Sequence, residues 1–399
     1  MPARDALRRL AGRGGGERQL DLPVPHALLD VLRDGPAPLA PSGDRERERL
    51  SVAVVIPAFR RASGGHATIA QLVRGLEQLG HACSLWIEDD EGRHAGAGDH
   101  ELQALFEGFF GPVAGPIRKG FGAWSGADVV MATGWQTVPR ALLLSDAGAR
   151  AYLVQDHEPE FYPTSAERMW AEWTYRQGLH CICASPWLAS LVRDRYDASA
   201  TPFHLGVEHA RYKPRPAERR DDLVLFYARA VTPRRAVPLG LLALTELHRR
   251  CPGVEIALFG ETRPLRCRFA HRDLGVLEPA QLAREYASAT VGLVLSLTNP
   301  SLIPQEMLAS GLPVVDVASQ SMVACFGSDG PVELAEPDPL ALCAAIERLL
   351  DDPALRARRE RLGAAWVAGR TWAAAAAQVE RGLREATRGS AAAEPRTAS

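Results

Sequence analysis

The sequence is poor in lysine, in paired cysteines and in long apolar runs, and each shortage argues against a class of protein. Lysine occurs only at Lys119 and Lys213, so arginine carries the positive charge, and the formal net charge of the 399-residue chain is only −2. Such a balance gives no indication of nucleic-acid binding. The seven cysteines form no CxxC pair and no Cys/His zinc spacing, so we expect reduced thiols.

Two further absences concern location and nucleotide motifs. No stretch approaches the roughly 20 apolar residues that cross a bilayer, and the Arg-rich start lacks the apolar centre of a secretory signal, so we expect a cytoplasmic protein. Residues 4–12 could form a short basic amphipathic helix that associates with the inner face of the membrane. The alternative is that this segment is disordered and solvated. Neither a Walker A sequence nor a GxGxxG between strand and helix is present, which argues against P-loop enzymes and dehydrogenases.

The patterns that are present indicate an α/β protein with two domains. At 399 residues, with 46% hydrophobic and 24% charged, the chain exceeds what one core usually serves. The apolar run SVAVVIPAF at 51–59 predicts a buried strand, and apolar residues at 69, 72, 73, 76 and 79 predict an amphipathic helix after it. Strand and helix patterns alternate from there and restart with DLVLFYA at 222, which predicts two doubly wound Rossmann-like domains.

Composition sets the expected boundaries. Residues 1–50 mix Gly, Pro and charge, so we interpret them as a loosely attached, partly disordered extension whose removal leaves the core folded. The first domain is expected over 51–205 and the second over 206–370, joined by a Pro-punctuated stretch from 204 to 220. A helix is expected over 371–388, followed by a mobile tail at 389–399.

A glycine pair follows the first strand. Gly64 and Gly65 stand in RASGGHATI, where a strand turns into a helix and the backbone can approach a ligand closely. The free amides of a helix N-terminus attract phosphate, so this turn could contact a diphosphate. A purely steric need for glycine is an equal alternative, and His66 has no assigned role.

The stretch 291–315, VGLVLSLTNPSLIPQEMLASGLPVV, opens a buried strand into a polar loop and a helix. We expect the helix to begin near Pro304, which places Glu306 in its first turn and Ile303 at the cap position. Open α/β sheets bind ligands at such strand ends. Because Ile303 cannot form a capping box, Glu306 is predicted to accept the two hydroxyls of a ribose, with helix capping as the alternative.

Two more polar segments follow predicted strands. Arg229, Arg234 and Arg235 lie beyond the strand at 222–228, and guanidinium groups match diphosphate oxygens in pairs. Arg229, which is nearest the strand, is the firmest choice of the three. Asp156, His157 and Glu158 follow the strand ending in YLVQ and could supply a base or bind sugar hydroxyls, with a carboxylate pair for metal or a solvated loop as alternatives.

Four of these segments, in chain order within 51–385, resemble motifs of the retaining GT-B glycosyltransferases of the large family four group. The Gly-rich loop and first helix, the linker HLGVEHARYKP, the arginine loop and the loop and helix around Glu306 each have a counterpart there. The resemblance implies two domains facing a cleft, with an acceptor-binding N-terminal domain and a nucleotide-sugar-binding C-terminal domain. It also implies that the helix TWAAAAAQVERGL crosses back to the first domain.

Within that group, YLVQDHEPEFYP, LFYARAVTPRR and LSLTNPSLIPQEM resemble the WsaF-type rhamnosyltransferases of surface-polysaccharide assembly. The resemblance implies dTDP-rhamnose as donor, a carbohydrate or glycoconjugate acceptor and no required metal or cofactor. Donor contacts would come from Gly64, Gly65, Arg229, Arg234, Arg235, Thr298, Ser301, Leu302 and Glu306.

The chain departs from the family pattern at one position. The family's first donor-site Glu is replaced by Thr298, which fits a deoxysugar better than glucose or mannose. In the implied mechanism, the departing phosphate takes the acceptor's proton during front-face attack, and Asp156 or His157 orients the acceptor. Three alternatives remain: a non-catalytic GT-B sugar-binding module, a transferase that uses a UDP- or GDP-linked donor, and a metal-dependent GT-A-type transferase that uses Asp156 and Glu158.

Overall fold

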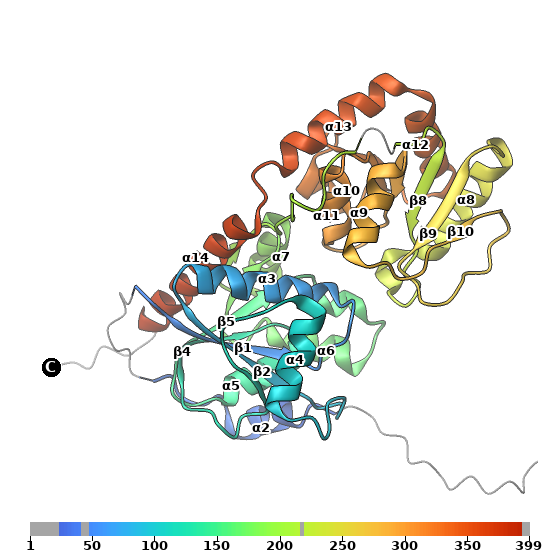
Figure 1. Ribbon diagram of the computed structural model, residues 1–399. Helices are drawn as coiled ribbons and strands as arrows, with labels where there is room; N and C mark the ends of the chain where they lie inside the picture. Colours follow the sequence, from blue (N-terminus) through green and yellow to red (C-terminus); the bar gives the residue numbers. More distant parts are fainter. Residues whose placement is uncertain (1–23, 41–47, 216–218, 393–399) are drawn as a thin grey trace, which may run out of the picture.

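The computed structural model of the chain describes residues 24–40, 48–215 and 219–392. The expected amphipathic segment at 4–12 and the end of the expected tail, from 393, lie outside these residues. Two lobes are visible, each built on its own sheet, and both sheets are parallel throughout their described pairings (Figure 1). The prediction of an α/β protein with two doubly wound domains is confirmed.

The N-terminal sheet has the strand order β3-β2-β1-β4-β5-β6-β7 within the described residues. Its central strand reads SVAVVIP and is buried on both faces, as expected for a parallel strand covered by helices on each side. The strands are β1 Ser51–Pro57, β2 Ala82–Glu88, β3 Ile117–Lys119, β4 Ala127–Ala132, β5 Ala147–Val154, β6 His180–Cys183 and β7 Ala200–Pro202. The helices are α2 His26–Asp34, α3 Gly64–Gln78, α4 Asp99–Phe110, α5 Val138–Leu143, α6 Ala166–Thr174 and α7 Pro186–Tyr196.

The C-terminal sheet has the order β10-β9-β8-β11-β12-β13 within the same described residues. The strands are β8 Leu223–Tyr227, β9 Glu255–Phe259, β10 Arg272–Asp273, β11 Val291–Leu293, β12 Val314–Val317 and β13 Val332–Ala335. The helices are α8 Val237–Arg250, α9 Pro279–Ser288, α10 Leu302–Ala309, α11 Gln320–Phe326, α12 Pro339–Asp351 and α13 Pro353–Val367. In both sheets the strand order reverses beside the first strand, and the crevice at such a reversal is where open α/β sheets bind ligands.

Helix α14, Trp372–Ala392, leaves the C-terminal domain and lies along the N-terminal one (Figure 1). Ala375, Val379 and Leu383 join the core that α3 and the first sheet form. Glycine makes the close approach feasible, since a Cβ on Gly75 would lie 2.4 Å from the Cβ of Ala376. The helix continues to Ala392, beyond the end expected at 388.

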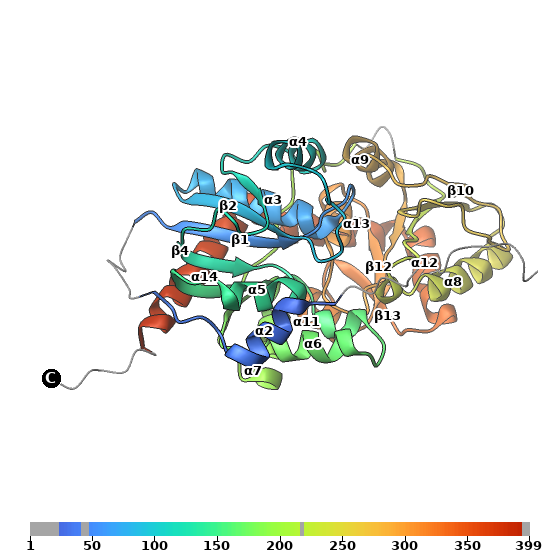
Figure 2. The ribbon, with the colours of Figure 1, turned by 90° about the horizontal axis from the view of Figure 1, so that it is seen from below.

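Residues 24–40 belong to the N-terminal domain, and the expectation of a loosely attached extension is wrong for this segment. Helix α2 packs on α5, and Figure 2 shows it against that side of the lobe. Ala27, Leu28 and Val31 are buried, and the backbone N–H of Ala37 donates to Leu142 O at 2.9 Å. The error came from the flanking Gly, Pro and charge, which hid the short amphipathic run HALLDVLRD.

Two global features complete the description. All seven cysteines are free thiols. Among the described helices, none is both long and apolar enough to cross a membrane.

We predict that Val31→Ala lowers the free energy of unfolding by about 1–2 kcal/mol, because it removes buried methyl groups from the contact between α2 and the domain. Leu32→Ala is the matched control, since Val31 is 5% exposed and Leu32 is 62% exposed on the same helix. The control should change stability by less than about 0.5 kcal/mol. Equal effects in urea titrations of the two variants would show that α2 contributes nothing to the core.

Candidate functional site

The two domains meet through residues that follow the carboxyl ends of their strands. Asp156 comes two residues after β5 of the first sheet. It contacts Arg234 and Thr298, which follow β8 and β11 of the second sheet. Strands β8 and β11 are neighbours, at the point where the order of the second sheet reverses. The interface therefore brings together the edges of both sheets at which α/β proteins bind ligands.

Asp156 is the centre of this interface. Its Oδ2 accepts from Arg234 Nε at 3.1 Å and from Thr298 Oγ1 at 2.9 Å. Its Oδ1 accepts from the backbone N–H groups of Asn299 and His157, each at 2.9 Å. The residue is only 7% exposed, so a carboxylate of one domain depends largely on donors of the other.

Asn299 adds a second set of bonds between the domains. Its side-chain Nδ2 donates to Gln155 O at 3.1 Å, and its Oδ1 accepts from Ser185 Oγ at 2.7 Å. Ser185 in turn caps α7 by accepting from Leu188 N at 3.0 Å. One buried amide thus joins the loop after β11 to two loops of the N-terminal domain. An ion pair between Arg61 and Glu278, both exposed, also links the domains and contributes little by comparison.

The three arginines of the loop after β8 have different surroundings. Arg235 is 5% exposed and donates to Ser296 Oγ at 3.4 Å inside its own domain. Arg234 bonds to Asp156, and its guanidinium lies 3.9 Å from the centre of the Phe161 ring, a cation–π contact with the other domain. Arg229 is partly exposed, and its long 3.5 Å bond to Gly260 O leaves most of its donors available. Of the three, Arg229 is the most weakly bonded within the described residues.

Glu306 lies on α10 among aromatic residues. Tyr212 from the interdomain linker and Tyr286 from α9 both face its carboxyl. Burial raises the pKa of Glu306 to about 8, and the neighbouring Tyr212 hydroxyl opposes that shift. At neutral pH this carboxyl is therefore largely protonated. A polar ligand that donates two hydroxyl hydrogens to it would favour the ionised form.

Helix α10 begins earlier than the sequence pattern predicted. Its first residue is Leu302 rather than Pro304, and Ser301 occupies the cap position without making a side-chain cap bond. Glu306 consequently lies beyond the first turn, where it cannot satisfy the free amides of the helix start. The structure removes helix capping as an explanation for Glu306. The amide of Leu302 stands in the first turn, as a phosphate contact requires.

His157 and Glu158 do not reach the interface, contrary to their expected role beside the acceptor. The His157 ring is fully buried, with Nε2 2.7 Å from the Tyr196 hydroxyl. Glu158 is 6% exposed and accepts from the backbone N–H of Trp135 at 2.7 Å. Burial raises the pKa of Glu158 to about 7. Both side chains hold the loop after β5 in place, and of these three residues Asp156 is the one for which the described residues show side-chain hydrogen bonds to the other domain.

The glycine pair forms the first turn of α3. A Cβ on Gly64 would meet no atom within 4 Å, and one on Gly65 would lie 3.5 Å from the amide of Gln155. No neighbour requires glycine at either position, which favours the interpretation that the backbone is kept open for a ligand. His66 bonds to Ser63 Oγ at 2.8 Å, and burial lowers its pKa to about 4, so this ring is a neutral support of the turn.

Several residues of the interface were missed by sequence reasoning. Asn299 and Gln155 stand directly beside predicted residues, and Phe161 and Tyr212 lie within quoted motifs, yet only the fold shows which way each points. The described residues contain no group of three or more His, Cys, Asp or Glu side chains placed to hold a metal ion.

Comparison with known proteins finds similarity to WsaF in both domains. The WsaF N-terminal domain matches residues 122–184, and the WsaF C-terminal domain matches residues 222–347. The O-antigen biosynthesis protein RfbC of Myxococcus xanthus is 29% identical over 358 residues, which is 87% of this chain. The chain spans only 28% of the length of that relative.

Solved structures show the same architecture at low sequence identity. Sucrose-phosphate synthase from Thermosynechococcus elongatus aligns with a TM-score of 0.64 at 17% identity, over 84% of this chain and 99% of that one. Anabaena HepE in complex with UDP and glucose aligns with a TM-score of 0.64 at 12% identity, over 84% and 100%. Both WsaF domains match in chain order on this two-domain GT-B fold, so the chain is similar to the WsaF-type glycosyltransferases.

Proposed function

We propose that the chain transfers a sugar from a nucleotide-sugar donor to a carbohydrate acceptor during assembly of a surface polysaccharide. The name of RfbC places that relative in O-antigen biosynthesis, and HepE binds UDP and glucose. The resemblance to WsaF-type rhamnosyltransferases makes dTDP-rhamnose the proposed donor. Thr298 supports this choice, since its hydroxyl is committed to Asp156 and offers no carboxylate to a sugar that carries more hydroxyls.

The observation that carries the proposal is the meeting of β8 and β11 at the reversal of the C-terminal sheet. Arg229 follows one of these strands, and the loop leading to Leu302 and Glu306 follows the other. A nucleoside diphosphate needs a cation and free amides for its phosphates and an acceptor for its ribose hydroxyls. We propose that these groups form the donor site, together with Gly64 and Gly65 of the first domain.

The proposed mechanism assigns the diphosphate to Arg229, to the amides near Leu302 and to the turn at Gly64 and Gly65. Donors fixed in advance around the leaving group stabilise the negative charge that develops on it. The acceptor oxygen then bonds to the anomeric carbon on the face from which the diphosphate departs, which retains the configuration without a protein nucleophile. The leaving phosphate takes the acceptor's proton. The position of Asp156 makes it a residue that holds the two domains in register for this step, and we propose no metal for it.

We predict that dTDP raises the Tm more than UDP or GDP at equal concentration, because a ligand stabilises a protein in proportion to the logarithm of its concentration over Kd. Slow hydrolysis of dTDP-rhamnose should accompany binding and persist in EDTA. A larger shift with UDP or GDP would reassign the donor, while nucleotide binding without turnover of any sugar donor would indicate a binding module.

We predict that affinity for dTDP increases between pH 6.5 and 8.5. The Glu306 pKa of about 8 means that the neutral carboxyl must lose its proton to accept both ribose hydroxyls, so binding favours higher pH. The gain is at most about tenfold per pH unit below the pKa. Glu306→Gln has no such proton and should show only the pH dependence of dTDP itself. Parallel calorimetric titrations with the same slope for both proteins would remove Glu306 from the ribose site.

We predict that Asp156→Asn and His157→Ala separate two roles. Asp156→Asn removes the charge that holds Arg234 and should lower the single-turnover transfer rate roughly tenfold or more, by the loss of about 1.5–3 kcal/mol in charged hydrogen bonds. His157→Ala empties a buried position and should instead lower the Tm, with a smaller effect on the rate. If Asp156→Asn transfers sugar at the parent rate, the bonds of Asp156 are not needed in the reactive arrangement.

A further inference from the structure

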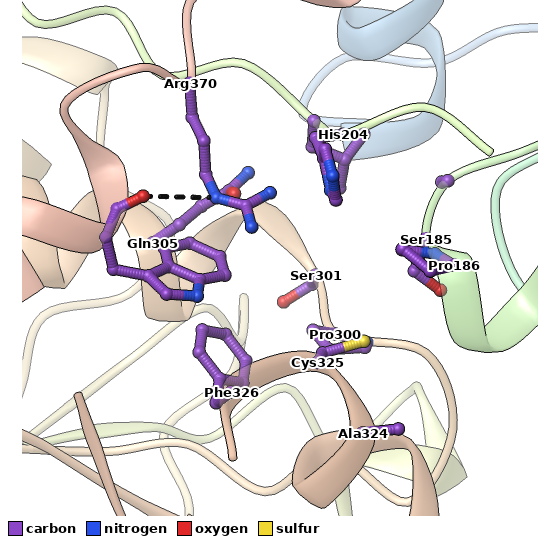
Figure 3. A pocket seen from close by; sticks show the side chains of 13 residues that line it. Ser185, Pro186, His204, Pro300, Ser301, Gln305, Ala324, Cys325, Phe326 and Arg370 are labelled. Atoms are coloured by element: carbon purple, nitrogen blue, oxygen red, sulfur yellow. Dashed lines mark hydrogen bonds between the residues drawn. The ribbon is translucent and has the colours of Figure 1, made fainter. Parts of the chain in front are cut away.

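A cavity of about 70 Å³ lies where the two domains, the linker and the crossing segment converge (Figure 3). Its wall contains residues from four parts of the chain. They are Ser185 of the N-terminal domain, His204 of the linker, Ser301 and Gln305 at α10, and Arg370 between α13 and α14. This volume admits a few waters or one small polyatomic ion. Ser301 is also a predicted donor contact, whereas Arg229, Thr298 and Glu306 are absent from the wall.

Two polar side chains in this wall lack a hydrogen-bond partner. Gln305 is 4% exposed, and its Nε2 has no acceptor within the described residues. The Oγ of Ser301 is also buried and makes no bond in the part of the chain that the structure describes. A buried donor without a hydrogen-bond partner lowers the stability of the fold by about 1–3 kcal/mol. Both groups therefore indicate that a molecule or ion in the cavity accepts their hydrogen bonds.

Arg370 supplies a positive charge to the same space. Its guanidinium extends toward the region between Gln305 and Ser301 (Figure 3). The Nε donates to Trp366 O at 3.3 Å, and the group lies 3.5 Å from the centre of the Trp366 ring. No carboxylate within the described residues forms an ion pair with Arg370, and none lines the cavity. Burial lowers the pKa of Arg370 to about 10, which leaves it charged at neutral pH.

The lining therefore offers donors and a charge without any opposing carboxylate. Gln305 Nε2, the Ser301 hydroxyl and the Nη groups of Arg370 can all donate to one acceptor. The guanidinium fork fits the paired oxygens of phosphate. Water could satisfy the two neutral groups but would leave the arginine charge without a counterion in a half-buried site.

We propose that this cavity, which we call the hinge pocket, binds a small oxyanion of the phosphate class between Arg370, Gln305 and Ser301. The site lies beside that of the donor nucleotide, and Ser301 stands between the two. Because its wall includes both domains and both connecting segments, an anion there holds the interdomain angle at which the cavity closes. The binding step is non-covalent and independent of the proposed transfer reaction.

The test is a titration of the full-length protein with inorganic phosphate, read as the shift in Tm, with sodium chloride at matched ionic strength as reference. The parent protein should show a saturable rise of a few degrees. Gln305→Leu should fold with equal or higher basal Tm, because an apolar side chain replaces an unsatisfied buried donor. That variant and Arg370→Met should lose most of the phosphate-dependent rise.

Arg229→Met is the matched control, since it removes an arginine from the proposed donor site and leaves the hinge pocket intact. It should keep the phosphate shift and lose affinity for dTDP. A phosphate shift that is lost only in Arg229→Met would place the ion in the donor site and overturn the proposal. A shift equal in all four proteins, or none in the parent, would mean a general salt effect or a cavity filled by water, and either would also overturn it.

A parallel titration with glycerol 3-phosphate distinguishes the source of the anion. A shift with inorganic phosphate alone identifies a free ion, whereas a shift with both identifies a phosphate group that a larger molecule can carry. In each case the dependence on Gln305 supports the hinge pocket. A failure of dTDP binding in the parent protein would count against the proposed glycosyl transfer and leave this test unaffected.

Discussion

The arrangement of the two domains depends on satisfying one buried carboxylate. Asp156 belongs to the N-terminal domain, but three of its four hydrogen bonds come from Arg234, Thr298 and Asn299 of the other. An ionised group 7% exposed is costly unless its partners are in place, so the domains cannot separate without hydrating it again. This one contact therefore couples the angle between the domains to the conformation of the loops after β8 and β11.

The contact of Asp156 with Arg234 also distinguishes the three arginines after β8 from one another. Arg234 is committed to Asp156 and Phe161, and Arg235 is enclosed in its own domain. Arg229 is left with donors to spare at the end of β8. Of these three arginines within seven positions, Arg234 bonds across the interface, Arg235 bonds inside its own domain and Arg229 is only weakly bonded. Substituting any of them therefore tests a different part of the molecule.

The features that the sequence could predict are those that depend on residues close together in the chain. Alternating strand and helix patterns depend on local periodicity, and they were sufficient for two doubly wound domains. The inward rotation of His157, the start of α10 at Leu302 and the packing of α2 depend on partners far along the chain. Asp156 was recognised as functional, but its partners Arg234 and Thr298 lie 78 and 142 positions away, where no local pattern could point.

Helix α10 and the loop before it connect these observations. Within nine positions, Thr298 and Asn299 bond to the first domain, Gln305 faces the hinge pocket and Glu306 lies near Tyr212 of the linker and Tyr286 of α9. A ligand on either side of so short an element acts on the same backbone. If an anion in the hinge pocket favours one interdomain angle, and the nucleotide favours the same angle, each must strengthen the other by an equal factor. Such coupling requires one structural element that contacts both ligand sites. Helix α10 with its preceding loop contacts the hinge pocket on one side and the proposed nucleotide site on the other.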